Sequence, residues 1–465
     1  RGRRRRSGSP SPQLQRRRPA RPQRCGMAQQ DALRRVFRCA LAEAAERLPS
    51  AAADSPELLA ELFTALSQEP SASAPEPGLV ECVRHAVDLS GLGAGLGAVA
   101  ARIRAEALEA LEEDGPGAFP GEVAIWAPGG GPRRASYTAR QCRGVLANAL
   151  LSNVQDTTAE VKAWSGGLYF RPMLRGAIGA SKLACLLRYF AASGEEGAAA
   201  DDEREVVFER RCPAPEHMEL SHFKAWILQR DDEATSPNCE LHGGRMEDIA
   251  EADAFVNFAN ANFGYGRFIP SCTQEEIMQM CCPEFNVGML HQGCMKASEV
   301  VVAHNVRRFS AYTGYADTFR FAGPWTGAPL LQSILTMDAV MGRHFSEDAV
   351  LRDVRKAYLA FQGCRLVSTG RWGCGVFGGH PPHKLLQQAL AARLAGCELR
   401  FSCFGSPDGC DVALDAARHG EVGPARLLTA LLAASARRGR VVDFERVFAE
   451  VMAAPGAAAA GAAAA

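Results

Sequence analysis

The stretch that decides the fold is AFVNFANANFGYGRFIPSCTQEEI, residues 254–277. It begins with a run of β-forming residues, Ala254 to Phe258, and continues through a loop that contains Gly264 and Gly266. It ends with the first residues of a predicted helix, which starts at Thr273. Glycine lets backbone N–H groups approach an anion closely, and the dipole of a following helix adds favourable electrostatics. Because ligands of α/β folds bind beyond the carboxyl ends of strands, this stretch predicts a cradle for a diphosphate.

Short β-rich runs alternate with helical patterns on both sides of this stretch. The β-rich runs are Val206 to Glu209, Ala254 to Phe258, Val300 to Ala303, Arg365 to Ser368 and Leu399 to Phe404. The helical patterns are Thr273 to Met280, Leu330 to Met341, Ala349 to Phe361, His383 to Leu394 and Ala425 to Ser435. This alternation is typical of an α/β protein with a mixed or parallel sheet between helices. We assign residues 206–452 to this α/β domain.

The residues before position 206 predict mainly helical structure. Apolar residues recur at helical spacing between Gln29 and Glu69, so residues 27–78 are assigned to a helix pair and a linker. Residues 79–205 are assigned to a helical accessory region, with helical patterns at Leu79 to Leu89, Val99 to Leu111, Tyr137 to Leu151 and Ala180 to Phe190. Composition predicts disorder for the arginine-rich arm 1–26 and for the Ala-Gly tail 453–465.

The chain of 465 residues is electrically balanced as a whole, but its charges are unevenly spread. Ten of its 52 basic residues are arginines within residues 1–26, which contain no acid, so the rest has a net charge of −10. The basic arm can bind a polyanion or direct nuclear import, or it can be upstream sequence read through before Met27. No segment reaches the roughly 18 consecutive apolar residues of a membrane helix, which predicts a soluble protein.

The sixteen cysteines occur at irregular spacings, and no Cys-x-x-Cys pair is present. This pattern favours reduced intracellular thiols over a disulfide framework or a zinc site. His380 and His383 flank two prolines, but the sequence offers no third metal ligand, so we expect a capping or surface role for them.

Two adjacent carboxylates, Glu275 and Glu276, lie in the first turn of the helix that begins after Thr273. Thr273-x-x-Glu276 matches the capping box, in which the glutamate accepts a hydrogen bond from the N–H of the capping residue. A purely structural role for Glu276 is therefore a strong alternative to a chemical one.

Two further loops follow predicted strands. The loop TGRWGCGVFGG, residues 369–379, contains five glycines, which lose much conformational entropy when the loop folds. A loop with so high a folding cost favours a binding role over a wide turn. The segment YTGY, residues 312–315, places two aromatic rings beside a glycine, which fits either base stacking or an ordinary core contact.

Together these motifs resemble those of the poly(ADP-ribose) glycohydrolase family, in the family's order and at its spacing. The matching segments are VNFAN (256–260), GYG (264–266), QEE (274–276), YTGYA (312–316), TGRWGCGVFGG (369–379) and FSCFG (401–405). The resemblance covers roughly residues 137–440. It implies a macrodomain-like fold preceded by helices, and a hydrolase that cleaves the ribose–ribose O-glycosidic bonds of poly(ADP-ribose), releasing ADP-ribose, without a metal or organic cofactor.

The resemblance also implies roles for single residues. Glu276 would be the catalytic acid/base, Glu275 would help to hold the ribose, and Asn257 would lie near the reacting sugar. The implied substrate-binding residues are Glu247 at the adenine, Asn260 and Gln274 at the ribose, Gly264 and Gly266 in the first loop, Gly373, Gly375, Phe377 and Gly378 around the diphosphate, and Tyr315 and Phe404 beside the terminal ADP-ribose.

The adjacent carboxyls constrain the chemistry that this role requires. Conventional glycosidases place two carboxyls roughly 5 to 10 Å apart on opposite sides of the sugar, which neighbours in one helical turn cannot do. One carboxylic acid would therefore protonate the leaving ribose oxygen and, once ionised, activate water. The substrate's own diphosphate would stabilise the oxocarbenium-like state.

Four positions depart from the family's pattern. Tyr265 interrupts a three-glycine loop, Asn257 replaces an aspartate, Arg371 replaces an asparagine, and His380 replaces an aspartate. A glycine-only conformation at Tyr265 would cost about 1–3 kcal/mol, and Asn257 removes a charge near the sugar. These departures keep open a first alternative, a catalytically weak protein that binds ADP-ribose or its polymer. A second alternative, a hydrolase of mono-ADP-ribosylated protein, stays open because macrodomain-like pockets recognise the terminal ADP-ribose unit in either substrate.

The expected partners are poly(ADP-ribose) and poly(ADP-ribosyl)ated proteins, with no membrane and no sequence-specific nucleic acid. Substrate and thiol usage predict a location in the nucleus, the cytoplasm or both, and the substrate suggests a part in the DNA damage response.

Overall fold

The structure is a computed structural model that describes residues 31–49, 53–67, 75–155, 168–195, 197–230, 239–264, 271–418, 423–437 and 444–453. The predicted basic arm, Tyr265, Gly266 and the tail beyond Ala453 lie outside the described residues. The helices are α1 (Leu41–Arg47), α2 (Pro56–Thr64), α3 (Pro77–Ser90), α4 (Leu96–Glu109), α5 (Ala139–Leu150), α6 (Gly176–Ala192), α7 (Leu220–Leu228), α8 (Gln274–Cys281), α9 (Glu347–Phe361), α10 (Pro381–Ala395), α11 (Cys410–Arg418), α12 (Pro424–Arg437) and α13 (Phe444–Ala453). The strands are β1 (Ala32–Arg35), β2 (Glu122–Ile125), β3 (Arg133–Thr138), β4 (Glu205–Arg211), β5 (Cys239–His242), β6 (Ala254–Ala259), β7 (Val300–Arg307), β8 (Ser310–Thr313), β9 (Arg320–Pro324), β10 (Leu331–Asp338), β11 (Leu366–Gly370) and β12 (Glu398–Ser402). Short 3₁₀ helices include η5 (Met246–Asp248) and η7 (Pro283–Leu290).

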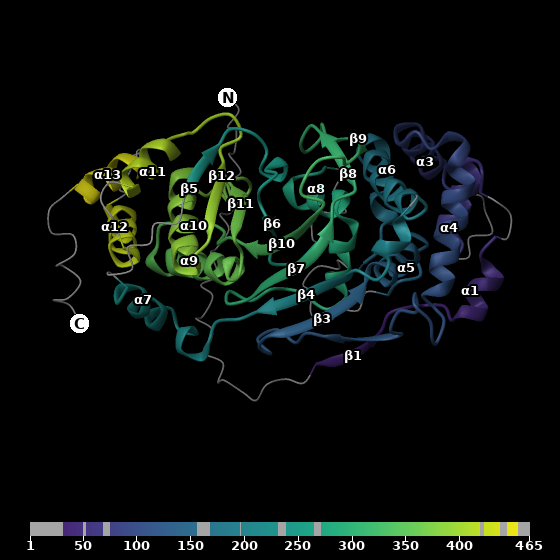
Figure 1. Ribbon diagram of the computed structural model, residues 1–465, viewed down its shortest axis with the longest axis horizontal. Coiled ribbons are helices and arrows are strands. Elements are labelled where there is room, and N and C mark those ends of the chain that lie inside the picture. Colours follow the sequence, from purple (N-terminus) through teal and green to yellow (C-terminus); the bar gives the residue numbers. More distant parts are fainter. Residues whose placement is uncertain are drawn as a thin grey trace, which may run out of the picture.

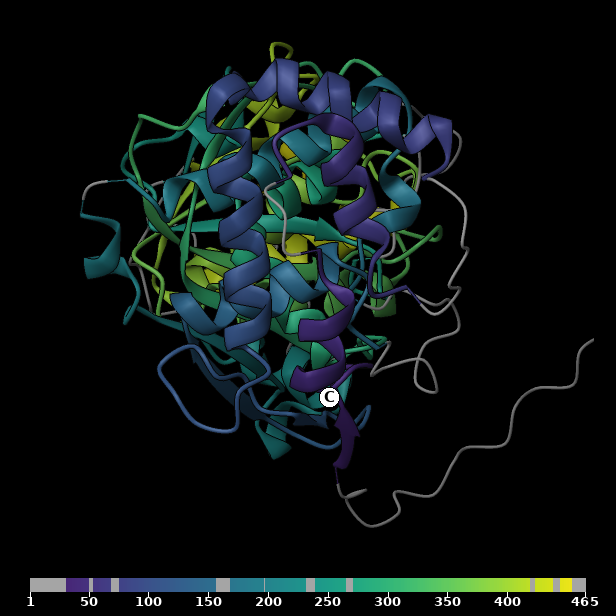
Figure 2. The same cartoon turned by 90° about the vertical axis from the view of Figure 1, so that its right-hand side faces the viewer.

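An eight-stranded mixed sheet forms the centre of the molecule, in the order β3-β4-β7-β10-β6-β11-β12-β5. The five strands from β10 to β5 are mutually parallel, and the pairs β3-β4, β4-β7 and β7-β10 are antiparallel. Helices α3 to α6 gather at one end of the sheet and α11 to α13 at the other (Figure 1), and the turned view brings α3 and α4 to the front (Figure 2). This architecture confirms the predicted α/β class with a mixed sheet between helices.

Strand β6, with which the stretch 254–277 begins, lies in the middle of this sheet. Strand β6 pairs in parallel with β10 on one side and β11 on the other. A strand covered on both faces needs an almost continuous apolar sequence, and β6 is buried at every position except Phe258, which is half-buried. Because β6, β11 and β12 run in the same direction, the loops that follow them meet at one edge of the sheet.

The helix predicted over Leu330 to Met341 is wrong, because most of these residues form strand β10. This strand lies between β6 and β7, and its residues from Ile334 to Asp338 are all buried. A short apolar run that is buried on both faces has no period that distinguishes a strand from a helix.

The N-terminal part of the chain is less helical than predicted. Residues Ala32–Arg35 form strand β1, which pairs antiparallel with β2, so the first half of the expected helix pair is corrected there. The region 79–205 contains β2 and also β3, an edge strand of the main sheet. The sequence also missed β5, β8 and β9, which are four or five residues long and carry too few residues to establish a period.

In the described part of the chain, no single helix is long and apolar enough to cross a membrane. One pair, Pro77–Ser90 with Gly93–Glu109, passes the same length and composition test only when its two segments are taken together across a bend of 116°. The fifteen cysteines of the described residues are all free.

A buried histidine joins the N-terminal part to the rest of the fold. The His291 ring is stacked near Trp126 and Tyr137, with centroids at 5.0 and 5.8 Å. Its Nδ1 lies 2.8 Å from the carbonyl oxygen of Ala124, so Nδ1 carries the proton and Nε2 accepts from the Tyr137 hydroxyl at 2.8 Å. Burial lowers the pKa of His291 to about 4, so the fold requires the neutral ring.

We expect the free energy of unfolding to fall as the pH drops from about 6.5 to 4. In this window the unfolded chain protonates His291 and the folded chain does not, so the unfolded state binds more protons, at a cost of up to about 3 kcal/mol. Denaturant unfolding at pH 7.5 and pH 4 measures the difference. The variant His291→Phe keeps an aromatic ring without a titratable group and should lose less stability over the same interval; equal losses in both proteins would contradict the prediction.

Candidate active site

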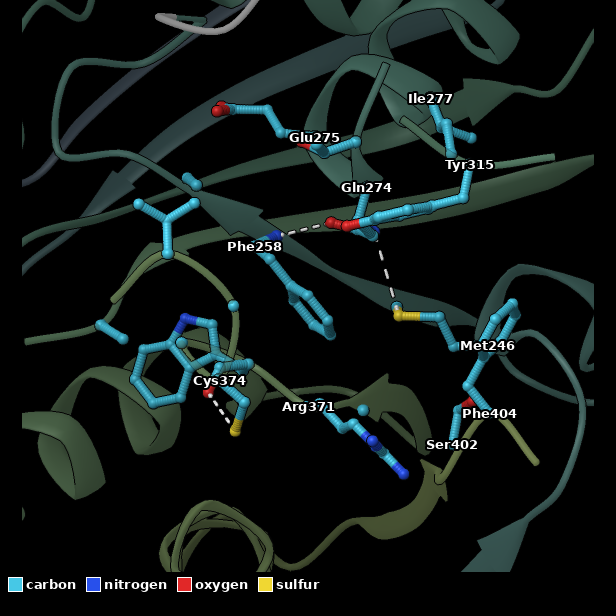
Figure 3. A pocket seen from close by; sticks show the side chains of 18 of the residues that line it. Met246, Phe258, Gln274, Glu275, Ile277, Tyr315, Arg371, Cys374, Ser402 and Phe404 are labelled. Carbon is cyan, nitrogen blue, oxygen red and sulfur yellow. Dashed lines mark hydrogen bonds between the residues drawn. The ribbon is translucent and has the colours of Figure 1, made fainter. Parts of the chain in front are cut away.

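A pocket of about 690 Å³ lies where the loops after β6, β11 and β12 meet, which is a typical volume for a small-molecule site. One wall is the start of α8, and the opposite wall is the glycine-rich loop 370–377. Figure 3 shows Gln274, Glu275 and Tyr315 on one side, with Arg371 and Cys374 across from them and Met246 and Phe404 at one end. The pocket therefore has polar groups at α8 and an apolar end beside Phe404.

Glu276 lines the pocket and also caps its own helix. One carboxylate oxygen, Oε2, accepts hydrogen bonds from the Thr273 backbone N–H at 2.8 Å and from the Thr273 hydroxyl at 2.5 Å. The structural alternative raised by the sequence is therefore present. However, Glu276, which is 2% exposed, is one of the residues that line the pocket, and its Oε1 accepts no hydrogen bond from any described residue. The capping contact thus leaves one oxygen for a ligand.

Glu275 is the more firmly held of the two carboxyls. It is 4% exposed, and its oxygens accept hydrogen bonds from Asn257 Nδ2 at 3.3 Å and from the backbone N–H groups of Gly264 at 3.3 Å and Asn260 at 3.4 Å. Burial and the like charge of Glu276 raise the pKa of Glu275 to about 8. At neutral pH the carboxyl pair therefore retains one proton.

Gln274 connects the helix start to strand β6. Its Oε1 accepts from the Phe258 N–H at 2.7 Å, and its Nε2 donates to the Val256 carbonyl at 3.0 Å. Figure 3 shows the Tyr315 ring beside Gln274. These contacts fix the first turn of α8 against the sheet.

Glu247 lies in η5 at the apolar end of the pocket. Its two carboxylate oxygens accept from Tyr312 Oη at 3.3 Å and from Gln274 Nε2 at 3.4 Å. Burial raises the pKa of Glu247. The Arg245 guanidinium lies 4.6 Å from the centre of the Tyr312 ring. The ring is therefore held by Glu247 at its hydroxyl and by Arg245 at its face.

The glycine-rich loop has a closed base and an open rim. At its base, the Gly379 N–H donates to the Gly373 carbonyl at 2.9 Å, and the Gly378 N–H donates to the Gly375 carbonyl at 2.9 Å. At its rim, the N–H groups of residues 375–377 donate to no other group in the described part of the chain. All three rim residues line the pocket. Unpaired backbone donors of this kind suit an anionic ligand.

Arg371, which departs from the family's pattern, ties two loops together. Its guanidinium donates to the carbonyls of Cys403 and Ser406 and pairs with Asp408 at 2.8 Å. In Figure 3 its side chain extends toward the side of Ser402 and Phe404. Phe404 is 64% exposed and has a left-handed backbone with φ of 48°. The arginine therefore fixes the loop that presents this ring.

Asn257, the second departure, lies behind the pocket wall. Its Nδ2 donates to Glu275 and, at 3.4 Å, to Thr336 Oγ1, whereas its Oδ1 has no hydrogen-bond partner among the described residues. The amide thus donates to a carboxyl that an aspartate would repel.

The structure brings most of the predicted site residues together. Glu247, Asn260, Gln274, Glu275, Glu276, Tyr315, Gly373, Gly375, Phe377 and Phe404 all line the pocket. Asn257 and Gly264 contact Glu275 from behind, Gly378 lies at the base of its loop, and Gly266 is outside the described residues. The sequence missed Met246, Ile277 and Ala339, whose apolar side chains look like ordinary core residues.

The two histidines near the glycine-rich loop have structural positions. His380 occupies the N-cap position of α10, but its side chain makes no capping hydrogen bond, so the predicted capping role is wrong for the side chain. The surface prediction is wrong for His383, which is buried, stacks on Phe345 at 4.3 Å and contacts the Ser435 hydroxyl at 3.2 Å.

The part of the chain that forms the site is similar to known proteins. Residues 228–410 match the family model described as poly(ADP-ribose) glycohydrolase, macro domain fold. The chain is 32% identical to poly(ADP-ribose) glycohydrolase 1 of Caenorhabditis elegans over 181 residues, which cover 33% of this chain and 23% of that protein. It is 31% identical to poly(ADP-ribose) glycohydrolase 1 of Arabidopsis thaliana over 195 residues, which cover 40% of this chain and 33% of that protein. The chain thus spans a third or less of the length of these relatives.

Solved structures of similar proteins have lower identity. The glycohydrolase of Deinococcus radiodurans in complex with ADP-ribose is 18% identical and covers 42% of this chain and 86% of its own, with a TM-score of 0.26. A Trypanosoma brucei macrodomain in complex with ADP is 16% identical and covers 38% and 69%, with a TM-score of 0.24. The matched segment contains both carboxyls of α8 and the glycine-rich loop, so the part of the chain that holds the pocket is similar to the poly(ADP-ribose) glycohydrolase family.

Proposed function

We propose that the protein hydrolyses the ribose–ribose O-glycosidic bonds of poly(ADP-ribose) and releases ADP-ribose, with Glu276 as the acid/base. The observation that carries the proposal is the carboxyl pair of α8, which lies in one open pocket with the donors of the glycine-rich loop. The match of residues 228–410 to the poly(ADP-ribose) glycohydrolase family model supports the same substrate class.

The reaction follows from the groups that line the pocket. The proton that the carboxyl pair retains passes from Glu276 Oε1 to the leaving ribose oxygen as the glycosidic C–O bond breaks. The negative diphosphate, held by the rim of the loop, stabilises the positive charge that develops on the sugar. The ionised carboxylate then removes a proton from water, whose oxygen bonds to the anomeric carbon. Glu275 holds the ribose, and its raised pKa keeps a proton within the carboxyl pair at neutral pH.

The first alternative function is a protein that binds terminal ADP-ribose with little turnover. The contact of Glu276 with Thr273 and the uncharged Asn257 favour it, because both reduce the freedom or the charge near the reacting bond. The second alternative is a hydrolase of mono-ADP-ribosylated protein, which needs the same pocket for the terminal unit.

One assay distinguishes the three functions. Purified full-length protein is incubated with labelled poly(ADP-ribose) and, separately, with mono-ADP-ribosylated protein, and the products are resolved by chromatography. Free ADP-ribose from the polymer supports the proposal. Retention of intact polymer supports the binding function, and release from the mono-modified substrate alone supports the third.

The protonation of the carboxyl pair predicts an alkaline limit to turnover. Because the raised pKa of Glu275 is about 8, the pair loses its proton as the pH rises through 8, and kcat should fall there. In Asn257→Asp, a carboxylate replaces the Nδ2 donor that lies 3.3 Å from Glu275, so like charge should hold the proton more tightly and move this limb to higher pH. Profiles of kcat against pH for both proteins test this; an unmoved or lowered limb contradicts it.

We also propose poly(ADP-ribosyl)ated proteins as the natural substrates, with a location in the nucleus, the cytoplasm or both and a part in the DNA damage response. The substrate class supports these proposals. Fluorescence microscopy of the tagged protein before and after DNA damage tests them.

A further inference from the structure

A buried group of charges lies directly beneath the glycine-rich loop. Lys384 of α10 binds Asp353 of α9, and Arg352 joins Asp353 to Asp338 at the end of β10. Lys356 also binds Asp338. Helices α9 and α10 pack together beside the sheet (Figure 1), so this group, which we call the α9–α10 charge cluster, lies between them and the carboxyl end of β10.

The side chain of Lys384 packs against the glycine-rich loop. A Cβ placed on Gly373 would lie 3.5 Å from Lys384 Cε, and one placed on Gly379 would lie 3.2 Å from it. The Lys384 ammonium is 4.9 Å from the centre of the Trp372 ring. Trp372 and Gly373 line the pocket, so the loop alone lies between Lys384 and the space that a ligand would fill.

The cluster carries more positive than negative charge. Arg352, Lys356 and Lys384 supply three cations, whereas Asp338 and Asp353 supply two anions, which leaves one positive charge in excess. Both lysines and Asp353 are fully buried, so solvent screens this charge poorly. The Asp353 carboxylate also accepts from the Val340 N–H at 3.1 Å, which ties the cluster to the segment after β10.

We infer that the α9–α10 charge cluster is the electrostatic base of the diphosphate site, with Lys384 as its positioning residue. The excess positive charge attracts the diphosphate through the loop, and the Lys384 side chain holds Trp372 and Gly373 in place. Lys384 touches no substrate atom and acts through the loop. The inference rests on the proposed function, because it requires a ligand with phosphate groups in the pocket.

The test uses two variants that change the charge of the cluster in opposite directions. Lys384→Met keeps an unbranched side chain under the loop and removes the excess charge, whereas Asp353→Asn keeps an acceptor for Val340 and adds a second excess charge. Calorimetric titration of the full chain with ADP-ribose and with adenosine measures the effect. We expect Lys384→Met to weaken ADP-ribose binding about tenfold and Asp353→Asn to tighten it about threefold. Adenosine, which carries no phosphate, should bind all three proteins equally.

A merely structural role gives a different pattern. If the cluster only supports the loop, both substitutions weaken binding, and they weaken it for adenosine as well as for ADP-ribose; this result overturns the inference. If Asp353→Asn does not fold, the variant Asp338→Asn is used in its place, because it makes the same charge change at the other carboxylate. Wild-type protein that binds no ADP-ribose overturns both the inference and the proposed function. Charge-dependent binding without polymer hydrolysis supports the inference and contradicts the proposed function.

Discussion

Replacing Glu276 by glutamine is expected to lower the rate of poly(ADP-ribose) hydrolysis by about 10²- to 10⁴-fold, the usual contribution of a general acid/base. Glutamine keeps the shape of the side chain and can accept the hydrogen bonds that Thr273 donates to Oε2, because glutamine occupies the same position in capping boxes. It cannot transfer a proton from the other oxygen. Turnover should therefore fall while the affinity for ADP-ribose and the thermal stability stay close to those of the wild type.

The protein contains a natural control for this substitution. Helix α5 begins with a capping box of its own, in which Gln141 accepts from the Thr138 N–H at 3.0 Å, far from the pocket. Gln141→Ala should cost about 1 kcal/mol of stability without changing turnover. If Glu276→Gln leaves the rate unchanged, capping is the whole role of Glu276 and the proposed mechanism is wrong.

Replacing Gly373 by valine is expected to destabilise the fold by about 3–5 kcal/mol and to abolish binding of ADP-ribose. Gly373 has φ of 72°, a region that β-branched residues avoid, and a Cβ placed there would lie 2.5 Å from the Cβ of Ala339. The loop must move to admit the side chain, and the rim donors that face the ligand move with it. Denaturant unfolding and calorimetric titration measure the two effects.

Gly375→Val separates the two causes. A Cβ at Gly375 meets no atom within 4 Å, and Gly375 does not have the positive φ of Gly373. This variant should therefore keep its stability but bind ADP-ribose more weakly, because its side chain occupies space that the phosphate approaches. Equal stability of the two variants would contradict the argument from backbone conformation.

The sequence predicts those parts of the structure whose signals are local. The capping pattern at Thr273 predicts the start of α8, and short β-rich runs followed by glycine loops predict strands β6 and β11. Strand β10 was misread because its burial on both faces removes the period that separates strands from helices. Its place between β6 and β7 depends on pairing with residues that are distant in the sequence.

In the candidate site, too, local motifs identify the residues, whereas their contacts depend on the tertiary fold. Its residues were named from their motifs, and ten of them line one pocket. The buried contacts of Glu275 with Asn257 and Gly264, which accompany its raised pKa, depend on tertiary packing that no local pattern encodes. The same holds for Arg371, because its ion pair with Asp408 joins two loops that only the fold brings together.

Strand β3 has a practical consequence for anyone who wishes to shorten the chain. It pairs along its whole length with β4, from Arg133 opposite Arg210 to Thr138 opposite Glu205. A truncation that starts at Val206 would strip this partner away and leave one side of β4 with bare amide and carbonyl groups. Exposed strand edges of this kind recruit other chains. We expect such a fragment to aggregate during purification, whereas one that begins before Arg133 keeps the edge covered.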